Sequence, residues 1–272
     1  QGELGGPRIG GRDAFVSRYD GDGWLLWTKQ FGTTGYDESW GVSADGLGNV
    51  YIAGVTDGSV DGTIPGGYDA FVSKFDSNGT LLWAEQIGTR NSETSYAVSA
   101  DQLGNVFITG HTQGSLGGAA SGRTDGFVSK YDASGTLQWT QQMGTRQDEL
   151  GRGISADGSG NVYVSGFTKG DLEGTSDRNN TDAFVRKYDT AGVLLWTEQL
   201  GISTDASDLT FGVSADGLNN DYVTGITNGD LVGANAGGTD GFVARIIESA
   251  IPEPSSSTIA CVALVGLMFR RR

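Results

Sequence analysis

The chain has 272 residues, of which 46 are glycine and 4 are proline, and 37% of its residues are hydrophobic. That composition can bury a core, so it excludes disorder over most of the length, and glycine-rich, proline-poor chains favour short strands joined by tight turns. The formal net charge of −15 argues against a nucleic-acid partner, and the single cysteine, Cys261, excludes an intrachain disulfide or a cysteine metal cluster.

A sequence unit of about 56 residues repeats along the chain. The word Asp-[Ala/Gly]-Phe-Val begins at residues 13, 69, 125, 182 and 240. A tryptophan with a glutamine three positions later recurs at Trp27, Trp83, Trp139 and Trp196. Ser-Ala-Asp begins at residues 43, 99, 155 and 214, and Gly-x-Thr-x-Gly begins at residues 54, 110, 166 and 225.

Each unit contains four runs with the composition of β-strands. In the second unit they cover residues 40–44, 50–56, 70–75 and 81–87, separated by Gly/Asp/Asn/Ser clusters. An Asp-started, Gly-ended loop such as 76–79 predicts a hairpin turn. The chain is therefore predicted to be all-β, a β-propeller of four-stranded antiparallel blades, because a blade buries its faces only against its neighbours.

These words resemble those of the bacterial β-propeller repeat family nicknamed "seven-bladed". The resemblance covers about residues 1–246 and rests on Trp-[Thr/Ala]-x-Gln, Ala-Asp-x-x-Gly-Asn-Val-Tyr, Gly-x-Thr-x-Gly and Asp-Ala-Phe-Val in a fixed order. It implies a propeller of exported bacterial proteins and supplies no catalytic residues.

The predicted propeller covers residues 1–247, and 248–272 form a separate tail. The opening residues match 113–118, so the chain begins inside a repeat and holds about four full repeats and part of a fifth. The third strand is expected five times and each other strand four times. One strand is then surplus to a closed four-blade ring, and we expect a fragment from which upstream blades and a signal peptide have been lost.

The tail has three parts: Pro252-Glu253-Pro254, an apolar stretch ending at Phe269, and Arg270-Arg271-Arg272. The apolar run would form a short helix of roughly 16 Å, against a bilayer core of about 30 Å. The arginines should stay on the cytoplasmic side and act as a membrane stop. This tail resembles the PEP-CTERM sorting signal of Gram-negative bacteria, which implies an exosortase-type sorting protease as partner and transient membrane association through residues 255–269.

The chain offers few candidates for catalysis. His111 is its only histidine, and Val55, Phe167 and Ile226 occupy the equivalent positions, so His111 is expected to pack. Most acids recur in every repeat, which predicts turn and strand hydrogen bonding. Acids that break the symmetry are expected in connecting loops: Asp148, Glu149, Glu173 and Asp177. A paired-carboxylate, carbohydrate-active propeller enzyme stays open as an alternative.

A calcium-stabilised module is the other alternative. Asp20, Asp22 and Asp157 lie in Asp/Gly loops that could supply oxygen ligands, although such loops equally form turns without metal. Trp24 and Trp40 could be exposed platforms for sugar or could pack at an edge. We expect an exported, non-enzymatic surface or matrix propeller without a cofactor. Its polysaccharide or protein partner is not named by the sequence.

Overall fold

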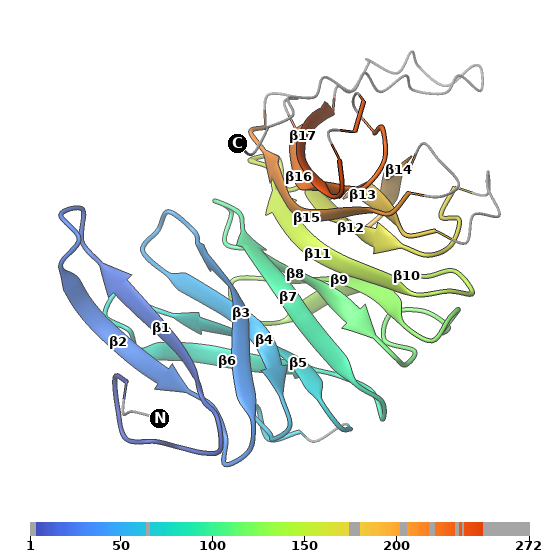
Figure 1. Cartoon of the computed structure of the whole chain (residues 1–272). Coiled ribbons are helices and arrows are strands. Elements are labelled where there is room, and N and C mark those ends of the chain that lie inside the picture. The colour runs from blue at the N-terminus through green and yellow to red at the C-terminus, as the bar shows by residue number, and fades with distance from the viewer. Residues whose placement is uncertain are drawn as a thin grey trace. The chain divides into compact units, whose positions relative to one another are not determined.

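The computed structural model describes residues 4–63, 66–173, 180–201, 206–217, 221–231, 234–235 and 237–246. This part of the chain folds into seventeen strands and contains no helix (Figure 1). The expected short C-terminal helix and the whole tail 248–272 lie outside the described residues. No helix in the described part is long and apolar enough to cross a membrane.

The strands form five antiparallel sheets whose members follow one another in the chain. The two-stranded sheet holds β1 (Ala14–Tyr19) and β2 (Leu25–Phe31). The next holds β3 (Asp37–Ala44), β4 (Val50–Thr56), β5 (Asp69–Phe75) and β6 (Leu81–Ile87). The third holds β7 (Glu93–Ala100), β8 (Val106–Thr112), β9 (Asp125–Tyr131) and β10 (Leu137–Met143).

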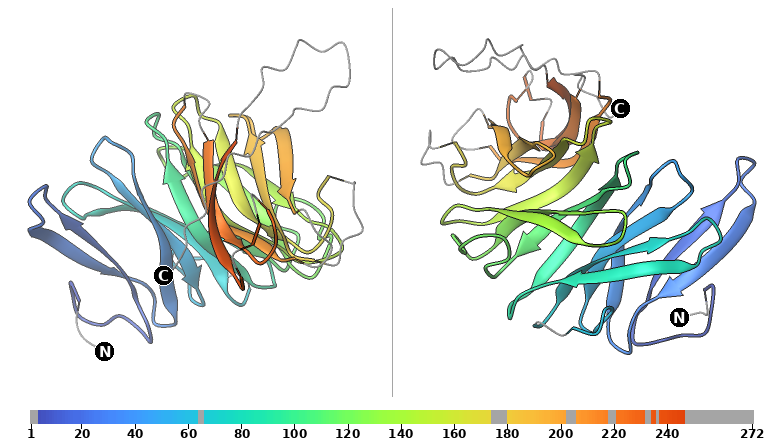
Figure 2. Two further views of the ribbon diagram at one scale, coloured as in Figure 1. Left: turned by 45° about the horizontal axis from the view of Figure 1, so that its top comes forward. Right: turned by 180° about the vertical axis from the view of Figure 1, so that it is seen from behind.

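The fourth sheet holds β11 (Glu149–Ala156), β12 (Val162–Thr168), β13 (Asp182–Tyr188) and β14 (Leu194–Leu200). The last holds β15 (Asp208–Ala215), β16 (Asp221–Thr227) and β17 (Asp240–Ile246). The expected strand count per repeat is thus confirmed for the described residues. The chain divides into two compact units, Gln1–Gly151 and Arg152–Arg272. Within the first unit, the β1–β2 hairpin lies beside the sheet of β3 to β6 (Figure 2).

The hairpin turns form as the sequence predicts. In the β5–β6 turn, Asp76 Oδ1 accepts the amide of Thr80 at 2.8 Å, and Gly79 takes a φ of +76°. Only glycine adopts that conformation without steric cost, so the Asp-x-x-Gly pattern fixes the turn locally.

The first strand of each sheet begins earlier than predicted. In the second repeat it starts at Asp37, not at residue 40, because Asp37 pairs with Thr56 at the far end of the ladder. The register then shifts between Ser39 and Gly41, so Trp40 occupies a β-bulge. The same shift surrounds Tyr96 and Phe211. A bulge redirects a side chain without changing the length of the repeat.

The core lies between neighbouring sheets. One cluster of the first unit joins Tyr51, Val72 and Phe127, and another joins Phe31, Ile52 and Phe71. The second unit has its own cluster, which includes Val185, Val223 and Phe242. These residues are the apolar members of the repeated words, so the repeat pattern predicts the core.

The four repeated tryptophans occupy equivalent outer-strand positions and are largely buried, as expected, although each keeps a minor part of its surface in solvent. The turn between the third and fourth strands of the following sheet contacts the outer strand. In the first unit, Trp27 Nε1 donates to Ser77 O at 3.0 Å and Trp83 Nε1 donates to Ala133 O at 3.1 Å. Each indole therefore closes the gap between two sheets at its edge and leaves part of its ring in solvent.

Candidate functional site

The repeated aspartates at the start of the third strands are clamped by the repeated glutamines. Gln86 Nε2 donates to Asp69 Oδ2 at 2.8 Å and to Gly58 O at 3.0 Å, while Gln86 Oε1 accepts the amide of Val60 at 3.0 Å. The same bonds join Gln142 to Asp125 and Gln199 to Asp182. One amide side chain thus ties the loop after the second strand to the third and fourth strands.

The glycine that follows the outer strand is explained by the same aspartate. A Cβ on Gly88 would overlap the carboxylate of Asp69, and Gly144 and Gly201 stand in the same relation to Asp125 and Asp182. The pKa of Asp69 is raised, mainly because the carboxyl is buried and partly because Glu93 is near. The strand-start aspartates therefore belong to the packed frame of the repeat.

A second repeated acid begins the first strand of each sheet, at Asp37, Glu93, Glu149 and Asp208, each at most 1% exposed. Glu93 accepts the amide of Thr89 at 2.7 Å and the hydroxyl of Thr112 at 2.6 Å. Glu149 accepts both the amide and the hydroxyl of Thr145 at 2.6 Å. Glu149 was expected to lie in a connecting loop and to have no equivalent in the other repeats. It is instead the first residue of β11 and accepts the same hydrogen bonds from its threonine as Glu93 does.

This repeated acid is not evident from the sequence motifs, because it is Asp in two repeats and Glu in the other two. A signal was available in the constant spacing: a threonine lies four residues before the acid in Thr33/Asp37, Thr89/Glu93 and Thr145/Glu149.

The aspartates of the turns between the first and second strands form hydrogen bonds within those turns. Asp101 Oδ1 accepts the amides of Leu103 and Asn105 at 2.9 and 2.7 Å. In the second repeat, burial raises the pKa of Asp45, but hydrogen bonds from Asn49 and from the amide of Leu47 outweigh it and leave the pKa below its usual value. These contacts support the prediction that repeated aspartates serve turns.

The calcium candidates are engaged in the same way. Asp157 accepts the amides of Ser159 and Asn161 on Oδ1 and the amide side chain of Asn161 on Oδ2. Asp20 Oδ1 accepts the amides of Asp22 and Trp24. Among the described residues there is no group of three or more His, Cys, Asp or Glu that could hold a metal ion. Turn formation accounts for these aspartates without a cation.

Of the symmetry-breaking acids, Glu173 lies in the second unit, near Glu198 of β14. Glu173 accepts the amide of Gln199, and burial, with Glu173 nearby, raises the pKa of Glu198 in β14 to about 7. The pKa of Glu173 is also raised by burial. Asp148 lies beside Thr124 in an isolated bridge, and Asp177 lies outside the described residues. Burial and a neighbouring acid, Asp61, likewise raise the pKa of Glu85 in the first unit, so a raised carboxyl pKa recurs at this position of the repeat.

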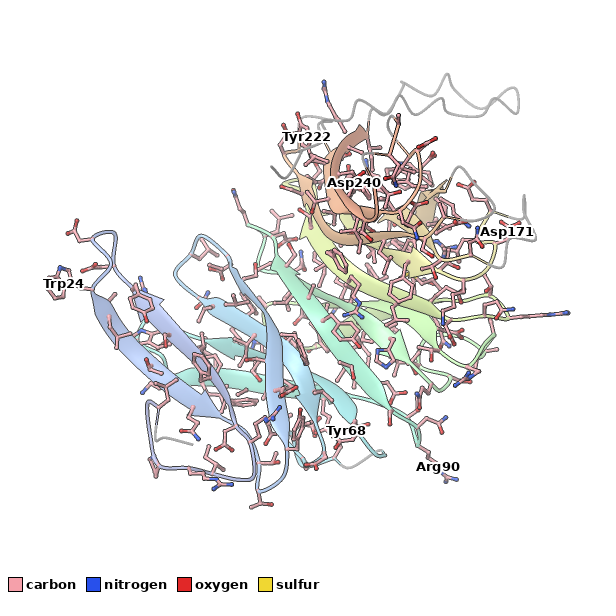
Figure 3. All side chains as sticks on the ribbon, in the orientation of Figure 1. Trp24, Tyr68, Arg90, Asp171, Tyr222 and Asp240 are labelled. Atoms are coloured by element: carbon pink, nitrogen blue, oxygen red, sulfur yellow. The ribbon has the colours of Figure 1, made fainter. Side chains whose placement is uncertain are left out.

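The bulges of the first strands in the first unit carry an aromatic row. Trp40 contacts the edge of Tyr96 at 6.0 Å between ring centroids, and Tyr96 stacks on His111 at 5.5 Å. Trp40 keeps 58% of its surface exposed. His111 therefore packs, as predicted, and Trp40 combines an edge contact with an exposed ring. Trp24, at the β1–β2 turn, is 75% exposed and projects into solvent (Figure 3).

A lysine, an aromatic ring and the repeated tryptophan stack on neighbouring strands of one sheet. Lys74 Nζ lies 5.3 Å from the ring centroid of Tyr51, and the Tyr51 ring lies 5.9 Å from that of Trp83. The same stacking occurs as Lys130–Phe107–Trp139 and Lys187–Tyr163–Trp196. Cation–π contacts of this kind hold the second and third strands of one sheet to its own outer strand.

The comparisons with known proteins agree with this repeat geometry. Residues 26–60, 82–117 and 138–173 match the family model of the SBBP beta-propeller repeat. The chain carries SBBP beta-propeller repeats. Each match begins in an outer strand and ends after the second strand of the following sheet, so the SBBP repeat unit straddles two sheets.

Two curated proteins are similar to the chain. Regulatory protein FlaEY of Caulobacter vibrioides is 29% identical over 183 residues, which cover 59% of this chain and 19% of FlaEY. An uncharacterized WD repeat-containing protein of Acanthamoeba polyphaga mimivirus is 21% identical over 232 residues, covering 66% and 17% of the two chains. The chain thus spans less than a fifth of the length of these relatives.

A solved luciferin-regenerating enzyme is also similar, at 13% identity and a TM-score of 0.26, covering 69% of this chain and 83% of the enzyme. A match of this quality supports no functional inference. The tail residues Pro252, Glu253, Pro254, Arg270, Arg271 and Arg272 lie outside the described residues, so their sorting and membrane roles stay predictions.

Proposed function

We propose that this SBBP-repeat chain is an exported, non-catalytic interaction module of the surface or extracellular matrix of a Gram-negative-type bacterium. The observation that carries the proposal is the use of the repeated acids. The carboxylates at Asp69, Glu93 and Asp101 accept hydrogen bonds from their own repeat, whereas aromatic rings such as Trp40 keep more than half of their surface exposed for contacts. The repeated carboxylates are therefore used in structural hydrogen bonds and not in catalysis, and the exposed rings are the side chains available to bind a partner.

The tail is the basis for the proposed localisation. An exosortase-type protease would read Pro252-Glu253-Pro254, residues 255–269 would hold the chain transiently in the inner membrane, and Arg270 to Arg272 would act as the cytoplasmic stop. Prolines 252 and 254 lack backbone donors and bias the preceding residues away from helix, so a processing enzyme would meet an extended segment.

Deleting residues 251–272 tests the sorting role. Expressed with an export signal in a bacterium that has an exosortase-type protease, the full chain should be found at the cell surface and the deleted chain in the medium. The melting temperature of the deleted chain should equal that of the full chain, because the tail serves sorting and not folding. A deleted chain that unfolds, or that is retained at the surface like the full chain, would refute the proposal.

The exposed Trp40 ring is the best-supported contact for a neutral partner, since the net charge of −15 disfavours polyanions. Trp40→Ala should weaken retention by matrix polysaccharide from the same bacterium, while Leu47→Ala, at an exposed turn residue, should not. Equal retention of both variants would remove Trp40 from the contact surface.

The pair Glu173 and Glu198 favours a second candidate, a paired-carboxylate, carbohydrate-active enzyme. A carboxyl with a pKa of about 7 stays partly protonated near neutral pH, as a general acid must. Hydrolysis of a polysaccharide by the wild type that is lost in Glu198→Gln would support this candidate over the non-catalytic one. Equal polysaccharide breakdown with and without the protein would eliminate it.

A further inference from the structure

The turn between β5 and β6 carries a sequence that its counterparts in the other repeats lack. Asn78-Gly79-Thr80 fits the pattern Asn-x-Ser/Thr, with a middle residue other than proline, which is the acceptor pattern for a glycan on asparagine. The glycine has a positive φ in all four turns, between +76° and +89°. The equivalent tripeptides are Asp22-Gly23-Trp24, Ser134-Gly135-Thr136 and Ala191-Gly192-Val193. The acceptor pattern is therefore specific to one of four turns with the same glycine geometry.

The side chain of Asn78 takes no part in holding the turn. Asp76 Oδ1 accepts the backbone amides of Asn78 and Thr80, each at 2.8 Å. Within the described part of the chain, nothing forms a hydrogen bond with the side-chain amide of Asn78, and both Asn78 and Thr80 are exposed. The turn thus depends on its backbone and on Asp76, and the Asn78 amide group is available to react.

The residues on either side of Asn78 pack against the neighbouring strand β2. Ser77 O accepts the indole N–H of Trp27 at 3.0 Å, and a Cβ on Gly79 would lie 2.9 Å from Trp27 Cδ2. These contacts fix the side of the turn that faces β2. Asn78 itself is exposed, so a bulky group on its Nδ2 extends into solvent and displaces neither contact.

We propose that Asn78 is an acceptor for N-linked glycosylation by a membrane oligosaccharyltransferase, an inference that rests on the proposed export. The donor is an oligosaccharide linked to a polyisoprenyl diphosphate. A bond forms between Asn78 Nδ2 and C1 of the first sugar while the bond from C1 to the diphosphate oxygen breaks. Polyisoprenyl diphosphate leaves with that electron pair, and Nδ2 gives up one proton to solvent. The Thr80 hydroxyl is the group that the pattern requires two residues after the asparagine.

A second reaction is chemically available at the same side chain, because glycine follows Asn78. Attack of the Gly79 nitrogen on Asn78 Cγ would release ammonia, and hydrolysis would leave a carboxyl in place of the amide. In the folded turn the Gly79 N–H donates to Asp76 O at 3.0 Å, which keeps this nitrogen engaged. The two reactions are distinguished by mass, since one exchanges an amide for a carboxyl and the other adds an oligosaccharide.

Peptide mapping of the exported full chain by mass spectrometry tests the assignment. The chain is expressed with an export signal in a bacterium that has an oligosaccharyltransferase and that glycosylates a reporter protein in the same cells. The peptide containing Asn78 should carry the mass of one oligosaccharide, and the same peptide from a strain without the transferase should carry none. Mapping also separates Asn78 from the other Asn-x-Thr of the sequence, at 179–181, whose first residue lies outside the described residues.

Two variants should remove the glycan and leave the turn intact. Asn78→Ala removes the acceptor nitrogen, and Thr80→Val removes only the hydroxyl two residues later. Ala191 and Val193 occupy these positions in the β13–β14 turn, so the repeat already accommodates both replacements. Each variant should lose the modified peptide completely, and the unglycosylated variants should melt within a few degrees of the unglycosylated wild type.

Ser134→Asn provides the matched gain, because it creates the same pattern before Gly135 and Thr136 in the β9–β10 turn. It should add one oligosaccharide at that position. An exported wild type with Asn78 unmodified or only deamidated, or equal modification of Thr80→Val, would overturn the inference. Since the experiment supplies the export signal, these results would leave the proposed surface role standing. Conversely, a glycosylated chain whose release does not depend on residues 251–272 would refute the sorting role alone.

Discussion

Replacing Gln86 by alanine tests the clamp that ties the loop after the second strand to the outer strand. The change removes three hydrogen bonds, to Asp69 Oδ2, Gly58 O and the amide of Val60. The two neutral bonds contribute about 1 kcal/mol each, and the bond to the buried carboxylate about 1.5–3 kcal/mol. Solvent and neighbouring groups recover part of this, so we expect Gln86→Ala to lower the free energy of unfolding by about 3 kcal/mol.

A loss of this size corresponds to a decrease in melting temperature of roughly 6–12 °C for a chain of this length. The assay is thermal and urea unfolding followed by far-ultraviolet circular dichroism. Gln138→Ala is the matched control, because Gln138 is exposed and bonds only to the neighbouring Asp132 and Thr136. Its effect should stay below about 0.5 kcal/mol. A Gln86→Ala protein within 1 kcal/mol of the wild type would refute the clamp.

Three further predictions follow from the acids. Asp101→Ala should cost about 1 kcal/mol in urea unfolding through its lost turn bonds, and loss of polysaccharide binding without loss of stability would indicate a site in place of a turn. The pKa of Glu198 is raised from 4.5 to about 7, so the contribution of its protonated carboxyl to folding stability is complete below pH 4.5 and is lost as the pH rises through 7. Glu198→Gln should therefore flatten the dependence of the free energy of unfolding on pH between 4.5 and 7. An unchanged pH dependence would contradict the raised pKa. A calcium chelator should leave the melting temperature unchanged, since turn amides already occupy Asp20 and Asp157, and a drop of several degrees would favour a calcium-stabilised module.

The strands could be predicted from the sequence because the repeat supplies several aligned copies of each one. The ranges 50–56 and 81–87 match β4 and β6 residue for residue, and the Asp-x-x-Gly turns form as expected. Local turn chemistry and alternating apolar residues are readable without tertiary information.

The parts that were wrong depend on strand register and on the hydrogen bonds of buried side chains. The bulge at Trp40 leaves no trace in the repeat length. The buried role of Glu149 is hidden by the exchange of Asp for Glu between repeats, which the structure tolerates because Glu149 and Asp37 each accept the amide of the threonine four residues earlier in their own repeat.

The cavity lined by Arg18, Trp27 and the turn between β3 and β4 could not be predicted from the sequence, because the repeat pattern gives no volume for the space between two sheets.

The intact mass of the mature protein tests the central proposal of export and sorting most directly. Protein recovered from the surface of a bacterium with an exosortase-type protease should retain the propeller repeats and lack the apolar tail, with its C-terminus near Pro252 to Pro254. Protein found in the cytoplasm with Arg272 still present would contradict the proposal.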